Sequence, residues 1–360
     1  MATEYDADIV MYVAMMGLCP TIALFGIVSN IINIIIFIKT GFSESITVSL
    51  LGLAISDLLA LVFVVPFIAF SNPIMLHSDD HPFNSIDVIF LAITFPYSAF
   101  TRITCLITAF VTIERCLCFV LPLRVKTLLT PRRSAIVICA IFAITLCTLI
   151  PPHLAAKLDW RHDTRRNKTI YGLVFKRKDS AQLMEIRTIM TLSIQLFSFF
   201  ALVVSNIALA ITVKRQAKWR ASSGAAGIQQ NGQLQQNSVE NAADSTMSRN
   251  RRLARMIQLL SFIQFVTFLP STLFYLVALG LPEFSMYGKY RNEYKSCWPS
   301  ATVLQCLNSS LNIIFYYRMN TRFRNRMAKM FKKGATRIFP ANANTMDNTV
   351  ETISQRPRPR

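Results

Sequence analysis

Seven long apolar blocks occupy most of this 360-residue chain and constrain its fold more than any other feature. A block of about 20 apolar residues is long enough to cross a bilayer as a helix. Because lipid offers backbone groups no hydrogen-bond partners, a crossing segment must bond internally, which favours helices. The sequence therefore predicts an all-α membrane protein with a seven-transmembrane helix bundle. The blocks are Ile9–Ile38, Ile46–Phe70, Val88–Leu121, Ser134–Ala156, Ile186–Val213, Met256–Leu281 and Ala301–Tyr317.

The composition supports a membrane protein and argues against a nucleic-acid partner. Hydrophobic residues make up 52% of the chain and charged residues only 16%, whereas a soluble domain has about 25% charged residues. The net charge of +19 would suggest nucleic acid on a soluble domain. Here the basic residues lie mainly in loops and in the tail, so we expect contact with membrane lipids and no nucleic acid.

The placement of the basic residues predicts an extracellular N-terminus. Positive charge collects on the cytoplasmic side of membrane proteins, and with residues 1–8 outside, most of the basic segments fall inside. One outer loop departs from this pattern, because Lys157–Arg187 carries nine basic and four acidic residues. The inner segments still outweigh it. We expect a multi-pass protein of the plasma membrane with its C-terminus in the cytoplasm.

The regions outside the apolar blocks divide the chain further. The bundle is expected to span residues 9–320, with a Gln-, Asn- and Ser-rich third intracellular loop at about 217–248 that is predicted to be disordered. Residues 321–333 are basic and amphipathic, which is typical of a short eighth helix lying on the anionic inner leaflet. We expect residues 334–360 to form a disordered cytoplasmic tail.

Polar residues recur at mid-depth within the predicted spans. A carboxylate such as Asp57 is costly in a bilayer unless a cation, a proton or several donors match it. Arg102 raises the same question for a positive charge. The other polar positions are Asn30, Thr104, Asn308, Ser309 and Asn312.

Several short motifs, in order and on successive spans, give this chain a family resemblance. Leu53–Asp57 matches a Leu-Ala-x-x-Asp motif, Glu114–Cys116 stands for Asp/Glu-Arg-Tyr, and Phe268–Pro270 stands for Trp-x-Pro. Asn312–Tyr316 is similar to an Asn-Pro-x-x-Tyr run. From about Met11 to Lys333, the chain resembles a rhodopsin-like (class A) G-protein-coupled receptor.

The chain also departs from the pattern of that family. Ile313 replaces the proline of the seventh span, and Phe268 replaces the tryptophan of the sixth. The family's usual disulfide ties the third helix to the second outer loop, but neither Asp87–Leu91 nor Trp160–Glu185 contains a cysteine. A bridge between Cys297 and Cys19 is one alternative, although sequence alone supplies no pairing geometry. These departures suggest a divergent branch, such as an invertebrate peptide or chemosensory receptor.

The resemblance implies a receptor that binds an extracellular ligand and activates a heterotrimeric G protein. It implies a switch made of Glu114, Arg115, Asn312 and Tyr316, in which the arginine pairs with its neighbouring acid at rest. The sequence has no paired carboxylates, metal cluster or nucleophile arrangement, so we do not expect an enzyme. A polytopic ion or solute transporter using Asp57 and Arg102 is the alternative, and the lack of repeat symmetry between the two halves argues against it.

Two interpretations of Asp57 follow from its polar neighbours. In one, the carboxylate is the centre of a hydrogen-bonded polar core. The family resemblance favours the other, a pocket in which a sodium ion stabilises the inactive state, with Asp57, Thr104, Asn308, Ser309 and Asn312 as its residues. Oxygen ligands around a carboxylate suit such a hard cation. We expect no other cofactor.

Arg102 is the second charged residue at mid-depth. It lies thirteen residues before Arg115, and a rise of 1.5 Å per residue places it roughly 20 Å above the cytoplasmic end of the third span. One interpretation is bonding to Gln195, Asn206 or backbone carbonyls. The other is an anchor for an acidic group of a peptide or small ligand. The candidate ligand-binding residues are Tyr97, Ser98, Arg102 and Phe268.

The sequence Asn167-Lys168-Thr169 fits the acceptor pattern for N-glycosylation. It lies in the predicted second outer loop, which reaches the secretory lumen during synthesis. We therefore expect a glycan on Asn167 and a glycoprotein at the cell surface.

Overall fold

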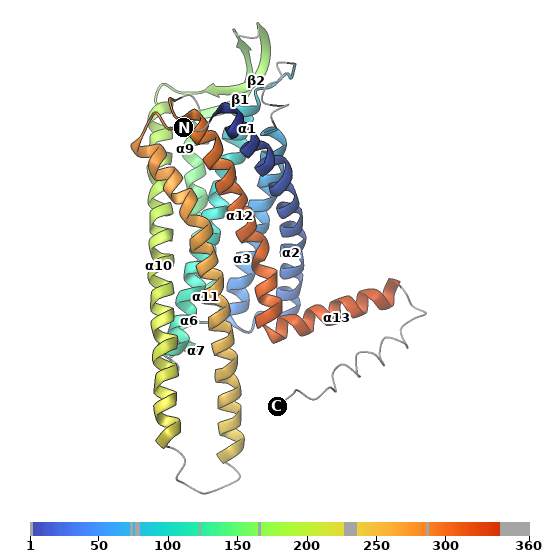
Figure 1. Ribbon diagram of the computed structural model, residues 1–360, viewed down its shortest axis with the longest axis vertical. Helices are drawn as coiled ribbons and strands as arrows, with labels where there is room; N and C mark the ends of the chain where they lie inside the picture. The colour runs from blue at the N-terminus through green and yellow to red at the C-terminus, as the bar shows by residue number, and fades with distance from the viewer. Residues whose placement is uncertain are drawn as a thin grey trace.

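The computed structural model describes residues 3–72, 75, 80–121, 124–164, 167–226, 236–285 and 288–338. Long helices stand side by side, with a β-hairpin at one end and one helix leaving the bundle at the other (Figure 1). The predicted helical bundle is confirmed. The hairpin was not part of the all-α prediction.

Three of the first four membrane helices contain a short change of helical pitch. The first comprises α1 (Glu4–Tyr12), η1 (Val13–Leu18) and α2 (Cys19–Thr40), and the second is α3 (Ser45–Phe70). The third comprises α5 (Ser85–Val88), η2 (Ile89–Thr94) and α6 (Phe95–Val120). The short α7 (Val125–Leu128) precedes the fourth, which comprises α8 (Pro131–Leu146), η3 (Cys147–Leu149) and α9 (Ile150–Ala155).

The remaining elements follow the outer hairpin of β1 (Ala156–Asp163) and β2 (Lys168–Phe175). They are α10 (Ser180–Ala226), α11 (Gln236–Gly280), α12 (Arg291–Met319) and α13 (Thr321–Ile338). Six helices of the described chain are apolar and long enough to cross a membrane. The seventh, α12, has 29 residues but carries a run of buried polar side chains, so composition alone identifies it less clearly.

Helices α10 and α11 extend into the segment that the sequence predicts to be disordered. The first continues to Ala226 and the second begins at Gln236, while residues 227–235 lie outside the described part of the chain. Nucleating a helix is costly, but adding residues to an existing helix is cheap. A polar sequence next to a stable membrane helix can therefore continue that helix.

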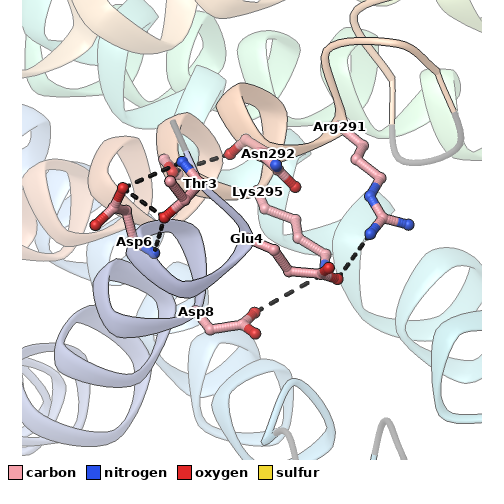
Figure 2. A network of polar contacts seen from close by, with 8 residues as sticks. Thr3, Glu4, Asp6, Asp8, Arg291, Asn292 and Lys295 are labelled. Atoms are coloured by element: carbon pink, nitrogen blue, oxygen red, sulfur yellow. Dashed lines mark hydrogen bonds and ion pairs between the residues drawn. The ribbon is translucent and has the colours of Figure 1, made fainter. Parts of the chain in front are cut away.

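The start of the chain is helical and bound to α12, as Figure 2 shows. Thr3 caps α1. Glu4 lies 2.7 Å from Arg291 and 3.9 Å from Lys295, and Asp8 lies 3.8 Å from Lys295. Each surface pair contributes little by itself, but together they fix the first turns of helix that the sequence assigned to the extracellular N-terminus at 1–8.

Helix α13 runs sideways from the foot of α12 (Figure 1). It begins at Thr321 and ends at Ile338, five residues after the predicted end of the amphipathic segment at 333. Phe323 is buried against the bundle, and Arg322 pairs with Glu44 at 2.6 Å. The predicted tail beyond 338 lies outside the described residues.

The cysteines do not form the bridge considered from the sequence. All eight are free thiols. Cys19 is buried in the same core cluster as Cys306 of α12, whereas Cys297 is exposed. The alternative bridge between Cys19 and Cys297 is therefore not formed, because Cys19 faces the interior of the bundle.

The outer hairpin is joined to the loop before the third membrane helix by backbone bonds. The strands β1 and β2 pair antiparallel from Ala156 with Phe175 to Asp163 with Lys168. Tyr171 of β2 donates its N–H to the Pro82 carbonyl at 2.7 Å and accepts from the Asn84 N–H at 2.9 Å. Residues 82–84 thus extend the hairpin as a short third segment.

Asp87 in α5 fastens the same hairpin with its side chain. The same carboxylate oxygen, Oδ2, accepts a hydrogen bond from Arg161 at 3.1 Å and a second one from the Leu173 N–H at 2.9 Å. Gly172 allows this close approach, since a Cβ there would lie 2.7 Å from the Asp87 oxygen. This polar clasp lies where the family has its disulfide, between the top of the third helix and the second outer loop.

Replacing Asp87 by Asn should loosen the hairpin. The substitution removes the ion pair with Arg161 and weakens the bond from the Leu173 N–H, at a cost of about 1–2 kcal/mol for a partly shielded charged acceptor. Hydrogen–deuterium exchange of the amides in residues 168–175 should become roughly five- to tenfold faster.

Asp179→Asn is the matched control, because Asp179 pairs with Arg177 in the same loop but both side chains are exposed. Its effect on exchange should be small. Equal protection of the hairpin in Asp87→Asn and in the parent would show that the clasp does not hold the loop.

Candidate functional site

The centre of the bundle is built around the fully buried Asp57 of α3. One carboxylate oxygen accepts bonds from Thr104 at 2.9 Å and Ser309 at 2.8 Å, and the other accepts from Asn312 at 2.7 Å. Three neutral donors from α6 and α12 therefore satisfy the charge. Such bonds to an ionised group are about twice as strong as bonds between neutral groups.

Further hydrogen bonds extend this network to the neighbouring helices. Asn30 of α2 donates to the Ser309 carbonyl at 2.8 Å. Asn308 donates to Gln264 of α11 at 2.6 Å. The Asp57 network, as we call these residues and the three donors, thus connects five membrane helices.

The structure brings four of the five predicted sodium-pocket residues into direct contact. Asn308 is the exception, because its amide is directed to Gln264 instead of Asp57. A cavity of about 10 Å³ lies beside Thr104, Asn308 and Ser309. That space is close to the minimum for one water molecule. The observed bonds match the polar-core interpretation, while the oxygen-rich lining also fits a small hard cation.

At the cytoplasmic end of α6, Glu114 is held by two serines and not by its neighbouring arginine. Its Oε1 accepts bonds from Ser45 of α3 and from Ser134 of α8, the second at 2.7 Å. Consecutive helical side chains point in different directions, so Arg115 lies on another side of α6. The expected ion pair between Glu114 and Arg115 is absent from the described residues.

Arg115 itself has no hydrogen bond or ion pair within the described part of the chain, and its Nε atom is buried. The residue is only 6% exposed, so most of its surface is removed from water. A buried cation without a counter-charge is costly. The arrangement leaves donors available at the cytoplasmic face.

Tyr316 lies in an aromatic cluster at the foot of the bundle. Its ring is 5.3 Å from that of Phe37 in α2 and 5.6 Å from that of Phe323 in α13. Its hydroxyl is buried and makes no hydrogen bond with the described residues. The four predicted switch residues therefore occupy three places: Asn312 in the Asp57 network, Tyr316 in this cluster, and Glu114 and Arg115 at the end of α6.

A cavity of about 290 Å³ opens near the outer side of the bundle, and we call it the outer cavity. Aromatic side chains from α3, α6, α11 and α12 supply much of its wall. Tyr97 is one of them and donates its hydroxyl to Gln305 at 2.7 Å. The aromatic lining residues are Phe67, Phe90, Phe95, Tyr97, Phe274, Tyr275, Tyr294 and Trp298.

The other predicted ligand residues lie below this wall. Arg102 donates to the Ser98 carbonyl at 2.6 Å, and its guanidinium lies 5.4 Å from the ring centre of Tyr275. Phe268 packs among Cys105 and Leu202, deeper in the bundle. Of the four predicted ligand residues, only Tyr97 lines the outer cavity.

The contacts of Arg102 agree in part with the interpretation that it bonds to protein groups. The backbone-carbonyl interpretation holds for one of its donors, through Ser98. Gln195 instead donates to Thr272, and Asn206 donates to the Leu202 carbonyl. No carboxylate contacts Arg102 within the residues described, and its Nε atom is buried without a partner.

The profile of the family described as "7 transmembrane receptor (rhodopsin family)" matches residues 29–316. The chain belongs to this receptor family. The assignment confirms a multi-pass membrane receptor that acts in signal transduction and is not an enzyme, and it removes the transporter alternative. A comparison with curated proteins gave no match.

One cation of this receptor's outer cavity was not recognised from the sequence. Arg187 of α10 lies on the cavity wall with its guanidinium 3.7 Å from the ring centre of Phe95. Its Nε atom is buried without a partner among the described residues. In the sequence, Arg187 belongs to the basic outer loop by charge, although it directly follows Ile186, the first residue of the fifth apolar block. Its position within that block was the sequence signal that Arg187 belongs to the membrane helix.

The hairpin tip carries the predicted glycan acceptor. Asn167 is exposed and has a φ of 47°, a left-handed conformation that asparagine adopts more readily than most residues. The side chain is therefore accessible on the outer side of the receptor.

The stability of the receptor should depend on acceptors at position 57. Asp57→Ala leaves the donors of Thr104, Ser309 and Asn312 unsatisfied in a buried site, which should cost roughly 2–4 kcal/mol. Asp57→Asn keeps one acceptor oxygen and should cost less. Thermal unfolding of purified receptor in sodium-free buffer measures both, and an Asp57→Ala receptor as stable as the parent would contradict this role.

Proposed function

We propose that this receptor binds an extracellular ligand, a peptide or a small acidic molecule, and activates a heterotrimeric G protein through Arg115. The main support is that Arg115 is buried at the cytoplasmic end of α6 without a partner among the described residues. Glu114 is occupied by Ser45 and Ser134. The arginine donors therefore remain free for another molecule.

The chemistry of Arg115 suits a protein partner at the inner surface. A guanidinium presents several donors in a fixed plane and bonds well to carbonyl or carboxylate oxygens. The carbonyls at a helix C-terminus carry partial negative charge and favour cations. A helix end inserted by a G protein would supply such acceptors.

Removing Arg115 should reduce coupling. We expect Arg115→Ala to lower agonist-driven or basal nucleotide exchange on a co-expressed G protein by at least about tenfold, the effect of losing roughly 1.4 kcal/mol of interaction. Arg318→Ala is the control, because it removes an exposed cytoplasmic arginine of α12. Equal exchange by Arg115→Ala and the parent at matched surface expression would refute the proposed role.

Weakening the hold on Glu114 should have the opposite effect. Glu114→Gln replaces the charge-assisted bonds from Ser45 and Ser134 with weaker neutral ones, so basal nucleotide exchange should rise by a few fold. Glu283→Gln makes the same change on an exposed outer residue and should not alter it. A Glu114→Gln receptor with parental basal activity would show that this anchor does not restrain the receptor.

We also propose that sodium acts at the Asp57 network as an allosteric ion. The support is the set of oxygen atoms around one carboxylate and the adjoining 10 Å³ cavity. Binding would require the hydroxyls of Thr104 and Ser309 to turn their lone pairs toward the ion. An ion that favours the inactive arrangement lowers agonist affinity by linkage.

Sodium should therefore weaken agonist binding to the parent receptor, and Asp57→Asn should remove this dependence. Competition binding in sodium and in choline at equal ionic strength measures the effect. Agonist affinity in the parent that does not respond to sodium would leave Asp57 with a structural role alone.

Charge on the outer surface supports an acidic ligand. Two carboxylates of the outer hairpin region are paired with nearby basic side chains. A hydrogen bond from Lys157 lowers the pKa of Asp159, and one from Arg177 lowers the pKa of Asp179. Both carboxylates therefore stay ionised, but the basic residues of Lys157–Arg187 outnumber them. The surplus positive charge would attract anions to the outer cavity.

Helix α13 suits contact with the inner leaflet. Arg324, Arg326 and Lys329 are exposed, and Phe331 is also 54% exposed on the same short helix. Basic and apolar side chains together favour an anionic membrane surface. We propose that α13 rests on lipid and positions the aromatic cluster around Tyr316.

A further inference from the structure

Two arginines lie at the outer cavity. Arg187 lines it together with Tyr275, and Arg102 lies behind Tyr275, with its guanidinium 5.4 Å from the ring centre. No carboxylate pairs with either guanidinium among the described residues. Each has a buried Nε atom without a partner. Arg102 is buried and Arg187 is partly buried, so water screens their like charges poorly and an anion between them would be favoured.

The surroundings of Arg187 indicate what else such an anion would carry. The guanidinium carbon lies over the Phe95 ring, 3.7 Å from its centre, and the guanidinium makes no hydrogen bond with the described residues. Tyr275 and Tyr97 add phenol groups, and Phe274 and Trp298 add apolar surface. These side chains would pack against a flat ring. The volume of about 290 Å³ is at the lower end for small-molecule sites, which favours a compact ligand.

We propose that the outer cavity binds a small aromatic carboxylate, whose acid group is held by Arg187 with Tyr275 and Arg102 behind it. The inference rests on the proposed receptor function and narrows its ligand class. Arg187, not Arg102, makes the direct contact, because Arg187 lines the cavity, whereas Arg102 is bonded to the Ser98 carbonyl and lies over the Tyr275 ring. Arg102 adds charge from below.

The test uses purified receptor and three matched probe pairs: benzoate and benzamide, phenylacetate and phenylacetamide, and indole-3-acetate and indole-3-acetamide. Each pair keeps the ring and changes the charge. Thermal unfolding is followed over a concentration series at fixed sodium and ionic strength. We expect at least one carboxylate to stabilise the parent at a concentration at least tenfold lower than its amide requires.

Two variants of Arg187 distinguish contact with the ligand from a purely structural role. Arg187→Gln should remove the preference for the carboxylate, and Arg187→Lys should keep part of it because the charge remains. Lys178→Gln removes an exposed loop cation and should leave the preference unchanged. If Arg187 only braces Phe95, then Arg187→Gln lowers the unfolding temperature while the preference persists, and the inference is wrong.

The inference is also wrong if no carboxylate stabilises the parent more than its amide. Nucleotide exchange with G protein distinguishes this failure from failure of the proposed function. Exchange that depends on Arg115 without any preference for carboxylates would leave the receptor function intact and refute only the ligand class. A carboxylate preference without exchange would support the site and refute the coupling.

Discussion

The hydrogen bonds that one buried carboxylate, Asp57, requires determine the arrangement of the receptor core. The carboxylate lies where water cannot reach it, so its donors must come from other helices. Thr104 comes from α6, and Ser309 and Asn312 come from α12. These bonds fix the rotation of α12, which in turn directs Tyr316 toward the aromatic cluster and Asn308 toward α11. Loss of the family's proline at Ile313 does not prevent this arrangement.

Arginines without a carboxylate partner among the described residues lie at opposite ends of this core. Arg187 and Arg102 are near the outer cavity, and Arg115 is at the inner face. Helix α11 lies between the two regions and is held by neutral bonds, from Asn308 to Gln264 at 2.6 Å and between Ser261 and Thr112 at 2.5 Å. Neutral hydrogen bonds contribute only about 1 kcal/mol each, so modest ligand binding energy can shift α11.

The sequence predicted the bundle and the Asp57 network because charged and amide side chains stand out in apolar spans. It did not predict the partners of Glu114, since Ser45 and Ser134 are ordinary residues far away in the chain. The clasp at Asp87 also depends on a hairpin register that no local pattern reveals. Arg187 was missed because a cation at the edge of an apolar block looks like loop charge. Phe268 was placed in the ligand site by resemblance, but packing buries it deeper.

We propose that neutral bonds such as the one between Thr112 and Ser261 hold α11 against α6 in one arrangement and that a G protein selects another. The distance between spin labels at Val120 of α6 and Arg252 of α11, both exposed positions, tests it most directly. Double electron–electron resonance is measured on receptor in which the native exposed cysteines have been replaced. The receptor alone should show one main distance between the labels. Nucleotide-free G protein should shift the population to a longer distance. A distance distribution that does not change when the G protein binds would contradict the account.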